Sequence, residues 1–176
     1  MNPLQILIFL ALFINYNWAS HCGHPVEGNQ IGGQCQKQPN WKQCTWKNTN
    51  DDRDNGQVHE CLFYKKSDNS YLRVAYQGNL RVACTYCCKR WYFTFNAKEC
   101  AIPAPIDALI LQHFPSGTPN IHRPGTQEGY CGGIRKGIVR VGFSVGNCHG
   151  FGSANAYTSW NSVSRIIIEE VDPPQA

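Results

Sequence analysis

Two cysteines of this chain stand at a spacing that metal sites and redox sites use. Cys84-Thr85-Tyr86-Cys87 is a C-x-x-C motif, and paired thiolates of this kind can ligate zinc or exchange with a disulfide. The sequence contains no second C-x-x-C motif and no H-x-x-x-H motif that would complete a zinc site. We therefore expect neither a metal nor a redox function for this pair.

The ten cysteines are instead candidates for disulfide bonds, because an even number of cysteines is typical of a secreted, cross-linked protein. Cys87 and Cys88 are neighbours, so on a strand they point to opposite faces and take separate partners. Cys84 ends an apolar pattern and is predicted to act as a staple in the core. The sequence leaves the pairing open among Cys22, Cys35, Cys44, Cys61, Cys84, Cys87, Cys88, Cys100, Cys131 and Cys148.

A hydrolase is the weakest functional hypothesis. A nucleophile, a base and an orienting acid could be assembled from Ser162, His122 and Asp107. No G-x-S-x-G elbow surrounds Ser162, which lies in a strand pattern. Glu169 and Glu170 face opposite ways as strand neighbours and do not form a catalytic pair. We expect no enzyme activity, no cofactor and no metal.

Basic residues are concentrated in the middle of the chain. From residue 61 to residue 148 there are eleven Lys or Arg and four acids, whereas the whole chain has a net charge of +4. Guanidinium groups on extended strands suit sulfate or carboxylate groups, as in sulfated glycans. The alternatives are an ordinary solvated surface and ion pairs with acids. The candidate basic face consists of Arg73, Arg81, Lys65, Lys66, Lys89 and Arg90.

The N-terminal residues have the pattern of a secretory signal peptide. Residues 1–19 carry no charged side chain, include an apolar run from Ile6 to Ile14, and end at Ala19. The run is too short to cross a membrane comfortably, and no later run approaches that length. We expect a secreted protein with neither a membrane span nor a nucleic-acid partner.

The remaining sequence predicts an arm followed by one all-β domain. Residues 20–57 are polar and aperiodic, which predicts an irregular arm held by its cysteines. Residues 58–172 have strand patterns. Tyr71 to Cys84 predicts a hairpin with a loop at residues 77–79, with Leu72, Val74, Tyr76, Leu80 and Val82 on the apolar face and Arg73 and Arg81 together on the other.

Further strand patterns follow this segment. Residues 90–96, 106–111 and 137–148 are predicted strands, and in the third of these Val139, Val141, Phe143 and Val145 point inward. Residues 162–171 contain three successive isoleucines, which predicts a central strand covered on both faces. Short strands separated by Gly, Pro and Asn clusters indicate a jelly-roll-like β-sandwich.

Several long segments resemble one family. They are CCKRWYFTFNAKEC (87–100), WNSVSRIIIEEV (160–171), WKQCTW (41–46), NIHR (120–123) and EGYCGGI (128–134). Together they are similar to the C-terminal globular domain of the collagen triple helix repeat-containing protein family, over about residues 39–171. The collagen-like segment that gives the family its name is missing, so a trimer would have to form through the globular head alone.

This resemblance implies a secreted, matrix-associated protein without catalytic activity. It also implies a fold similar to the trimeric heads of complement-type and tumour-necrosis-factor-like proteins, hence a homotrimer. Family members are linked to Wnt ligands, Frizzled receptors and collagen matrix turnover, so the first hypothesis is an extracellular modulator of such signalling. The alternative is a structural constituent of an extracellular matrix, including a mineralised one, with no signalling role.

Overall fold

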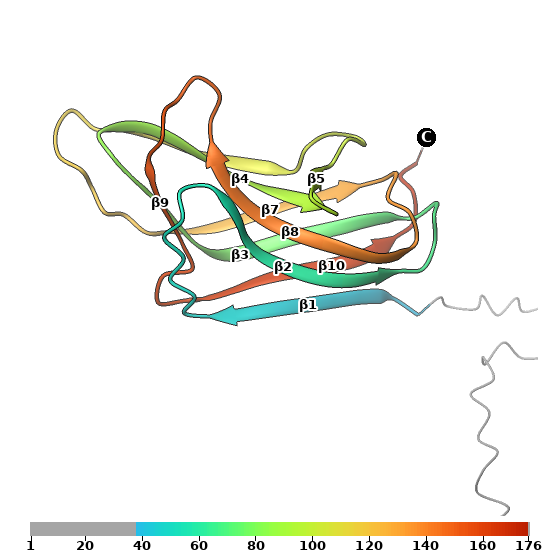
Figure 1. The fold of residues 1–176 in the computed structure, drawn as a ribbon. Helices are drawn as coiled ribbons and strands as arrows, with labels where there is room; N and C mark the ends of the chain where they lie inside the picture. Colours follow the sequence, from blue (N-terminus) through green and yellow to red (C-terminus); the bar gives the residue numbers. More distant parts are fainter. Residues whose placement is uncertain (1–37, 176) are drawn as a thin grey trace, which may run out of the picture. The chain divides into compact units, whose positions relative to one another are not determined.

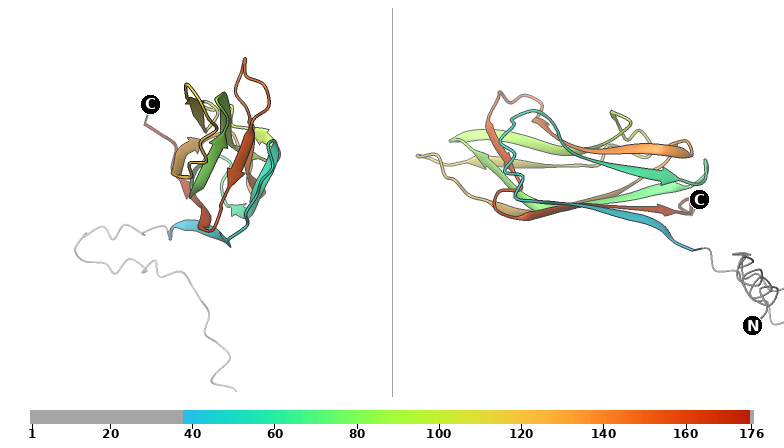
Figure 2. Two further views of the ribbon diagram at one scale, coloured as in Figure 1. Left: turned by 90° about the vertical axis from the view of Figure 1, so that its left-hand side faces the viewer. Right: turned by 60° about the horizontal axis from the view of Figure 1, so that its bottom comes forward.

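Two antiparallel β-sheets packed face to face form the part of the chain that the structure describes, residues 38–175 of a computed structural model (Figures 1 and 2). In the first sheet the strand order is β1 (Asn40–Lys47), β10 (Val163–Val171), β3 (Tyr71–Ala83) and β7 (Arg123–Cys131), with β9 (Asn155–Thr158) also paired to β3. In the second sheet the order is β2 (Gly56–Lys65), β8 (Gly137–Asn147), β4 (Tyr86–Phe95) and β5 (Lys98–Glu99), with β6 (Asp107–His113) also paired to β4.

This arrangement confirms the predicted all-β, disulfide-stapled sandwich. The predicted signal segment, Cys22 and Cys35 lie outside the described residues. No helix among residues 38–175 is long and apolar enough to span a membrane.

The predicted hairpin within residues 71–84 is wrong. Residues 71–83 form one continuous strand, β3, which pairs with β10 and β9 on one side and with β7 on the other. Gly78 lies inside this strand, where an added Cβ would collide with the side chains of Tyr76 and Ser164. The glycine is therefore required by close packing and not by a turn.

Two other expectations about strands also need correction. Residues 40–47 were expected in an irregular arm, but they form β1, which pairs along its whole length with β10. β10 lies between β1 and β3, as predicted for a central strand, but only its inner face is covered. Ile166 and Ile168 are fully buried, whereas Ile167 on the outer face is partly exposed.

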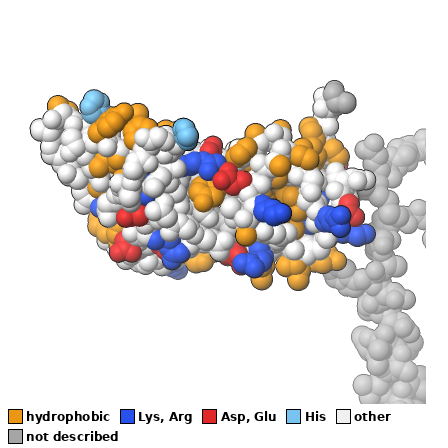
Figure 3. All heavy atoms as spheres, turned by 45° about the horizontal axis from the view of Figure 1, so that its top comes forward, with side chains coloured by type: hydrophobic (Ala, Val, Ile, Leu, Met, Phe, Trp, Pro, Cys, Tyr) orange, Lys and Arg blue, Asp and Glu red, His pale blue; other side chains and the backbone are white. Residues whose placement is uncertain are grey.

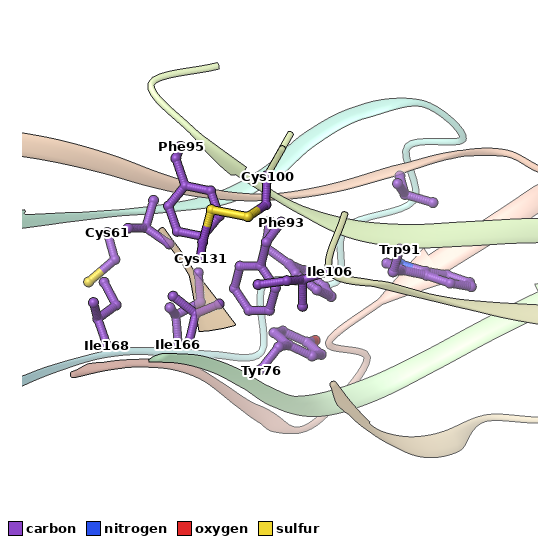
Figure 4. Close-up of a cluster of buried hydrophobic side chains, with 14 of the residues drawn as sticks. Cys61, Tyr76, Trp91, Phe93, Phe95, Cys100, Ile106, Cys131, Ile166 and Ile168 are labelled. Atoms are coloured by element: carbon purple, nitrogen blue, oxygen red, sulfur yellow. A yellow bond between two sulfur atoms is a disulfide. The ribbon is translucent and has the colours of Figure 1, made fainter. Parts of the chain in front are cut away.

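The core lies between the two sheets and is rich in aromatic rings (Figure 4). Tyr76 of the first sheet stacks on Phe143 of the second with ring centroids 3.8 Å apart, and Phe93 meets Phe143 edge-on at 5.3 Å. The indole of Trp91 is fully buried and donates a hydrogen bond to Thr158 Oγ1 at 3.0 Å. Burial with a satisfied polar atom is the arrangement in which a Trp stabilises a core most strongly.

Four disulfides connect the eight described cysteines: Cys44–Cys61, Cys84–Cys87, Cys88–Cys148 and Cys100–Cys131. The expectation that Cys87 and Cys88 take separate partners is confirmed. Cys84 is only partly buried and packs against the edge of the core. Cys44–Cys61 joins strands β1 and β2, and thereby fastens the edge of one sheet to the edge of the other.

Glu170 near the end of β10 fastens the β2–β3 turn to the sheet. Burial raises the pKa of its carboxylate, but hydrogen bonds outweigh this effect and lower the pKa to about 2. The donors are the hydroxyl of Ser70, the backbone N–H groups of Lys66 and Ser67, and the side chain of Asn40. The ionised carboxylate thus joins β10 to β1 and to the turn between β2 and β3.

We expect Glu170→Gln to lower the free energy of unfolding by about 1–3 kcal/mol at pH 7, because four hydrogen-bond donors, three of them in partly buried contacts, lose a charged acceptor. A carboxylate with a lowered pKa stabilises the fold above the unfolded value of 4.5 and loses this effect as the pH falls toward 2. Urea unfolding at pH 7 and pH 2.5 measures both. Glu60→Gln is the control, since Glu60 pairs with the exposed Arg140. An equal loss at both pH values would contradict this assignment.

Candidate functional site

The C-x-x-C cysteines form a disulfide with each other, with Cα atoms 6.0 Å apart. Their sulfurs are therefore not thiolates in the folded protein and are unsuited to hold a metal as they stand. Among residues 38–175 no group of three or more His, Cys, Asp or Glu side chains is placed to bind an ion.

The three residues of the hydrolase hypothesis do not meet. Asp107 pairs with Arg90 on the outer face of the second sheet. His122 Nδ1 lies 2.8 Å from the side-chain oxygen of Asn79, at the end of the first sheet. The hydroxyl of Ser162 is buried and forms no hydrogen bond. These three residues therefore do not form a set in which a nucleophile lies next to a base.

A different Ser–His cluster lies in the core, and no sequence motif pointed to it. His59 Nε2 lies 3.0 Å from Ser164 Oγ and 3.2 Å from Ser159 Oγ, and the ring of Trp46 stacks on the imidazole at 4.3 Å. Burial lowers the pKa of His59 to about 4, so the ring is neutral at pH 7. Only 4% of His59 is exposed. The cluster is closed to substrates and serves to join β2 to β10.

The residues of the predicted basic face are divided between the two sheets. Arg73 of β3 pairs with Glu128 at 2.6 Å and with Glu169 at 3.0 Å on the outer face of the first sheet. Arg90 of β4 pairs with Glu99 and Asp107 on the outer face of the second sheet. These two arginines therefore have carboxylate partners within the protein, and their charges are compensated.

Both predicted lysines on strands are buried, which corrects the expectation that they face solvent. Lys65 donates to the backbone carbonyl of Ser67, and Lys89 donates to the carbonyl of Asp54 and, at 2.7 Å, to Asn147 Oδ1. Burial lowers the pKa of both amines.

The other two members of the predicted basic face remain accessible. Lys66 is exposed and Arg81 is partly exposed. Arg81 lies on the same face of β3 as Arg73, eight residues and therefore about 26 Å further along. The structure does not bring the six residues together into one basic face.

Two apolar surfaces on the outer face of the second sheet were not predicted from the sequence. The Tyr64 surface, on β2 and β8, consists of Leu62, Tyr64 and Ile138, which are 50%, 65% and 71% exposed. The Leu109 surface, on β4 and β6, consists of Tyr86, Leu109 and Leu111, which are 62%, 62% and 51% exposed. The exposure of Ile138 in the Tyr64 surface could have been predicted, because neighbouring strand residues face opposite ways and Val139 is predicted to face inward.

Ion pairs separate the two apolar surfaces. Arg140 pairs with Glu60 at 3.0 Å, and Arg90 pairs with Glu99 and Asp107. Figure 3 shows paired basic and acidic side chains between hydrophobic groups on this side of the molecule. Since β2 and β6 form opposite edges of the sheet, the two surfaces lie at opposite corners of one face. Exposed apolar groups with polar surroundings are typical of protein–protein contacts.

A family model described as "CTHRC1, C-terminal domain" matches residues 36–168 of the chain. The match covers every described strand from β1 to β9 and most of β10.

Proposed function

Because the chain belongs to the CTHRC1 C-terminal domain family, we propose that it is a secreted, non-enzymatic binding protein that acts as a homotrimer in the extracellular matrix. The family is one of extracellular matrix-associated proteins and is not known as an enzyme family. The disulfides agree with this setting, since such bonds persist in oxidising compartments. The single observation that carries the proposal is the pair of apolar surfaces on the second sheet.

A ring of three identical subunits needs two different surfaces on each subunit. In such a head-to-tail assembly, one surface of each copy contacts the other surface of the next. The Tyr64 surface and the Leu109 surface lie at opposite corners of the same face, which suits contacts with two different neighbours. Apolar interfaces are typical of permanent assemblies, whereas transient contacts are more polar. A second copy of the chain is therefore the occupant that we assign to each surface.

Light scattering after gel filtration tests this assembly. We expect the wild-type protein to have the mass of a trimer, and Ile138→Lys and Leu109→Lys each to be monomeric, because each variant places a charge in one half of every contact. An equimolar mixture of the two variants should form dimers, since each such pair retains one intact contact. Val163→Lys, on the outer face of the other sheet and 42% exposed in the wild type, is the control and should stay trimeric. A wild-type monomer would refute the trimer, and a mixture without dimers would refute the head-to-tail arrangement.

We further propose that the trimer modulates signalling by binding Wnt-type ligands or Frizzled-type receptors. Family membership supports this step. Surface plasmon resonance against receptor ectodomains tests it: saturable binding supports a signalling modulator. Retention in insoluble matrix without such binding would favour the structural alternative.

A further inference from the structure

Arg81 belongs to a cluster of rings and amides at one end of the first sheet. Its guanidinium lies over the ring of Tyr157, 5.2 Å from the centroid, and donates a hydrogen bond to Asn120 Oδ1 at 2.7 Å. The imidazole of His122 stacks on Trp160 at 4.4 Å and meets Tyr157 edge-on at 5.9 Å. We call Arg81, Asn120, His122, Tyr157 and Trp160 the Arg81 cluster.

The cluster is accessible and is built from separate parts of the chain. Arg81 lies on β3, Tyr157 lies opposite it on β9, and the other members lie in the connections before β7 and after β9. Trp160 is 44% exposed. The stacked rings of His122 and Trp160 and the planar guanidinium of Arg81 thus lie close together, so a ligand could meet both aromatic and hydrogen-bonding groups.

The positive charge of the cluster has no carboxylate partner within the described residues. Arg73, Arg90 and Arg140 each pair with an acid, whereas Arg81 is held by the neutral amide of Asn120. Asp51, which bridges to β9, is paired with Arg53. Burial and the nearby charge of Arg81 both lower the pKa of His122.

A second uncompensated arginine lies on the same outer face. Arg165 of β10 is opposite Gln77, which is four residues and therefore about 13 Å along β3 from Arg81. Its side chain forms no ion pair among residues 38–175, and its Nε atom is buried without a partner, as is that of Arg81. On β3, the outward positions between the two arginines carry Gln77 and Asn79, which are polar and uncharged. A strip of unpaired positive charge thus runs along this face.

We propose that the Arg81 cluster and Arg165 bind an acidic polysaccharide, with Arg81 receiving a sulfate or carboxylate group and Trp160 packing against a sugar ring. Guanidinium groups bind such anions through two parallel hydrogen bonds. Aromatic faces pack against the C–H faces of sugars, and side-chain amides match sugar hydroxyl groups. An extended polyanion also explains why two arginines are left unpaired on one strip. The site lies on the opposite sheet from the proposed trimer contacts, so it goes beyond that function and does not depend on it.

Heparin is the probe for this site, and the full-length protein is used throughout. We expect Arg81→Gln to weaken heparin binding at least tenfold, as loss of a charged hydrogen-bonded contact does. Trp160→Ala, which keeps the net charge, should weaken it by about threefold or more if the ring packs on a sugar. Arg140→Gln is the matched control: it removes the same charge from an exposed ion pair on the other sheet and should stay within about twofold of wild type. Equal melting temperatures would show that the variants are folded.

Three results would overturn the proposal. Equal losses in Arg81→Gln and Arg140→Gln would show that net charge alone drives binding. Unchanged heparin binding by Trp160→Ala would refute the proposed contact between Trp160 and a sugar ring. Binding of a sulfotyrosine peptide without binding of heparin would assign the site to acidic peptides. Titration calorimetry with a heparin oligosaccharide and with the peptide distinguishes these cases without any measurement of oligomeric state.

Discussion

Removing the Cys88–Cys148 disulfide is expected to lower the free energy of unfolding by about 4 kcal/mol. This bridge spans 60 residues of sequence, and a cross-link that closes a long loop removes much of the entropy of the unfolded chain. It also joins the start of β4 to the residue after β8, next to the Leu109 surface. The double variant Cys88→Ala/Cys148→Ala leaves no odd thiol to mispair, and guanidinium unfolding measures the loss.

Cys84→Ala/Cys87→Ala is the matched control for this prediction. Its bridge spans only 3 residues, so the same entropy argument gives a loss of about 2 kcal/mol. Both double variants remove two partly or fully buried sulfurs, and the difference between them isolates the effect of loop length. Equal losses, or a larger loss for the short bridge, would contradict the argument.

The structure of β3 shows that alternation in a sequence predicts which face of a sheet a residue lies on better than it predicts where a strand turns. A three-residue loop at residues 77–79 and an uninterrupted strand both leave Tyr76 and Leu80 on one face, because their separation of four keeps the alternation in phase. The inward set of Leu72, Val74 and Val82 is therefore confirmed, although the hairpin is wrong. A glycine at position 78 is typical of a turn, whereas in this strand close packing against Tyr76 is what requires it.

The predicted basic face is not formed for a different reason. A charged residue in a strand pattern does not show whether its charged group reaches solvent or is buried. Lys65 and Lys89 alternate in phase with core residues such as Phe63 and Trp91, so the pattern itself placed them inside. Which backbone carbonyls receive their amines depends on turns far away in sequence, such as the carbonyl of Asp54 for Lys89. Long-range partners of this kind are not encoded in local spacing.

The partners in ion pairs are also not predictable from local spacing in the sequence. Arg73 meets Glu128 and Glu169 only because β7 and β10 flank β3, and that strand order was not predictable from the residues. Arg81 lies on the same face and yet escapes such pairing. The sequence thus identified arginines as candidates for binding an anion, whereas the strand order determines that Arg73 is paired with acids and Arg81 is not.

His59 is expected to make the fold sensitive to mild acid: the free energy of unfolding should fall by about 3 kcal/mol between pH 7 and pH 4. Burial lowers the pKa of His59 from 6.5 to about 4, while the charge of Asp51 acts against this shift and that of Arg53 adds to it. Between these two pH values the unfolded chain binds a proton that the folded protein does not, so stability falls with pH and then levels off below about 4. This pH range lies above the range of about 4.5 to 2 in which Glu170 loses its stabilising effect, so the two effects can be measured separately.

Urea unfolding from pH 8 to pH 3.5 measures this dependence. His59→Gln can retain hydrogen bonding to Ser159 and Ser164 but loses the ring that stacks on Trp46, so the variant should be less stable at pH 7. Because glutamine cannot take up a proton, its stability should change much less between pH 6.5 and pH 4. His113→Gln is the control, because His113 is exposed on β6 and its replacement should leave the acid-dependent loss intact. A His59→Gln profile as steep as that of the wild type would mean that other groups carry the acid sensitivity, and that the imidazole between Trp46 and β10 is not held neutral by burial.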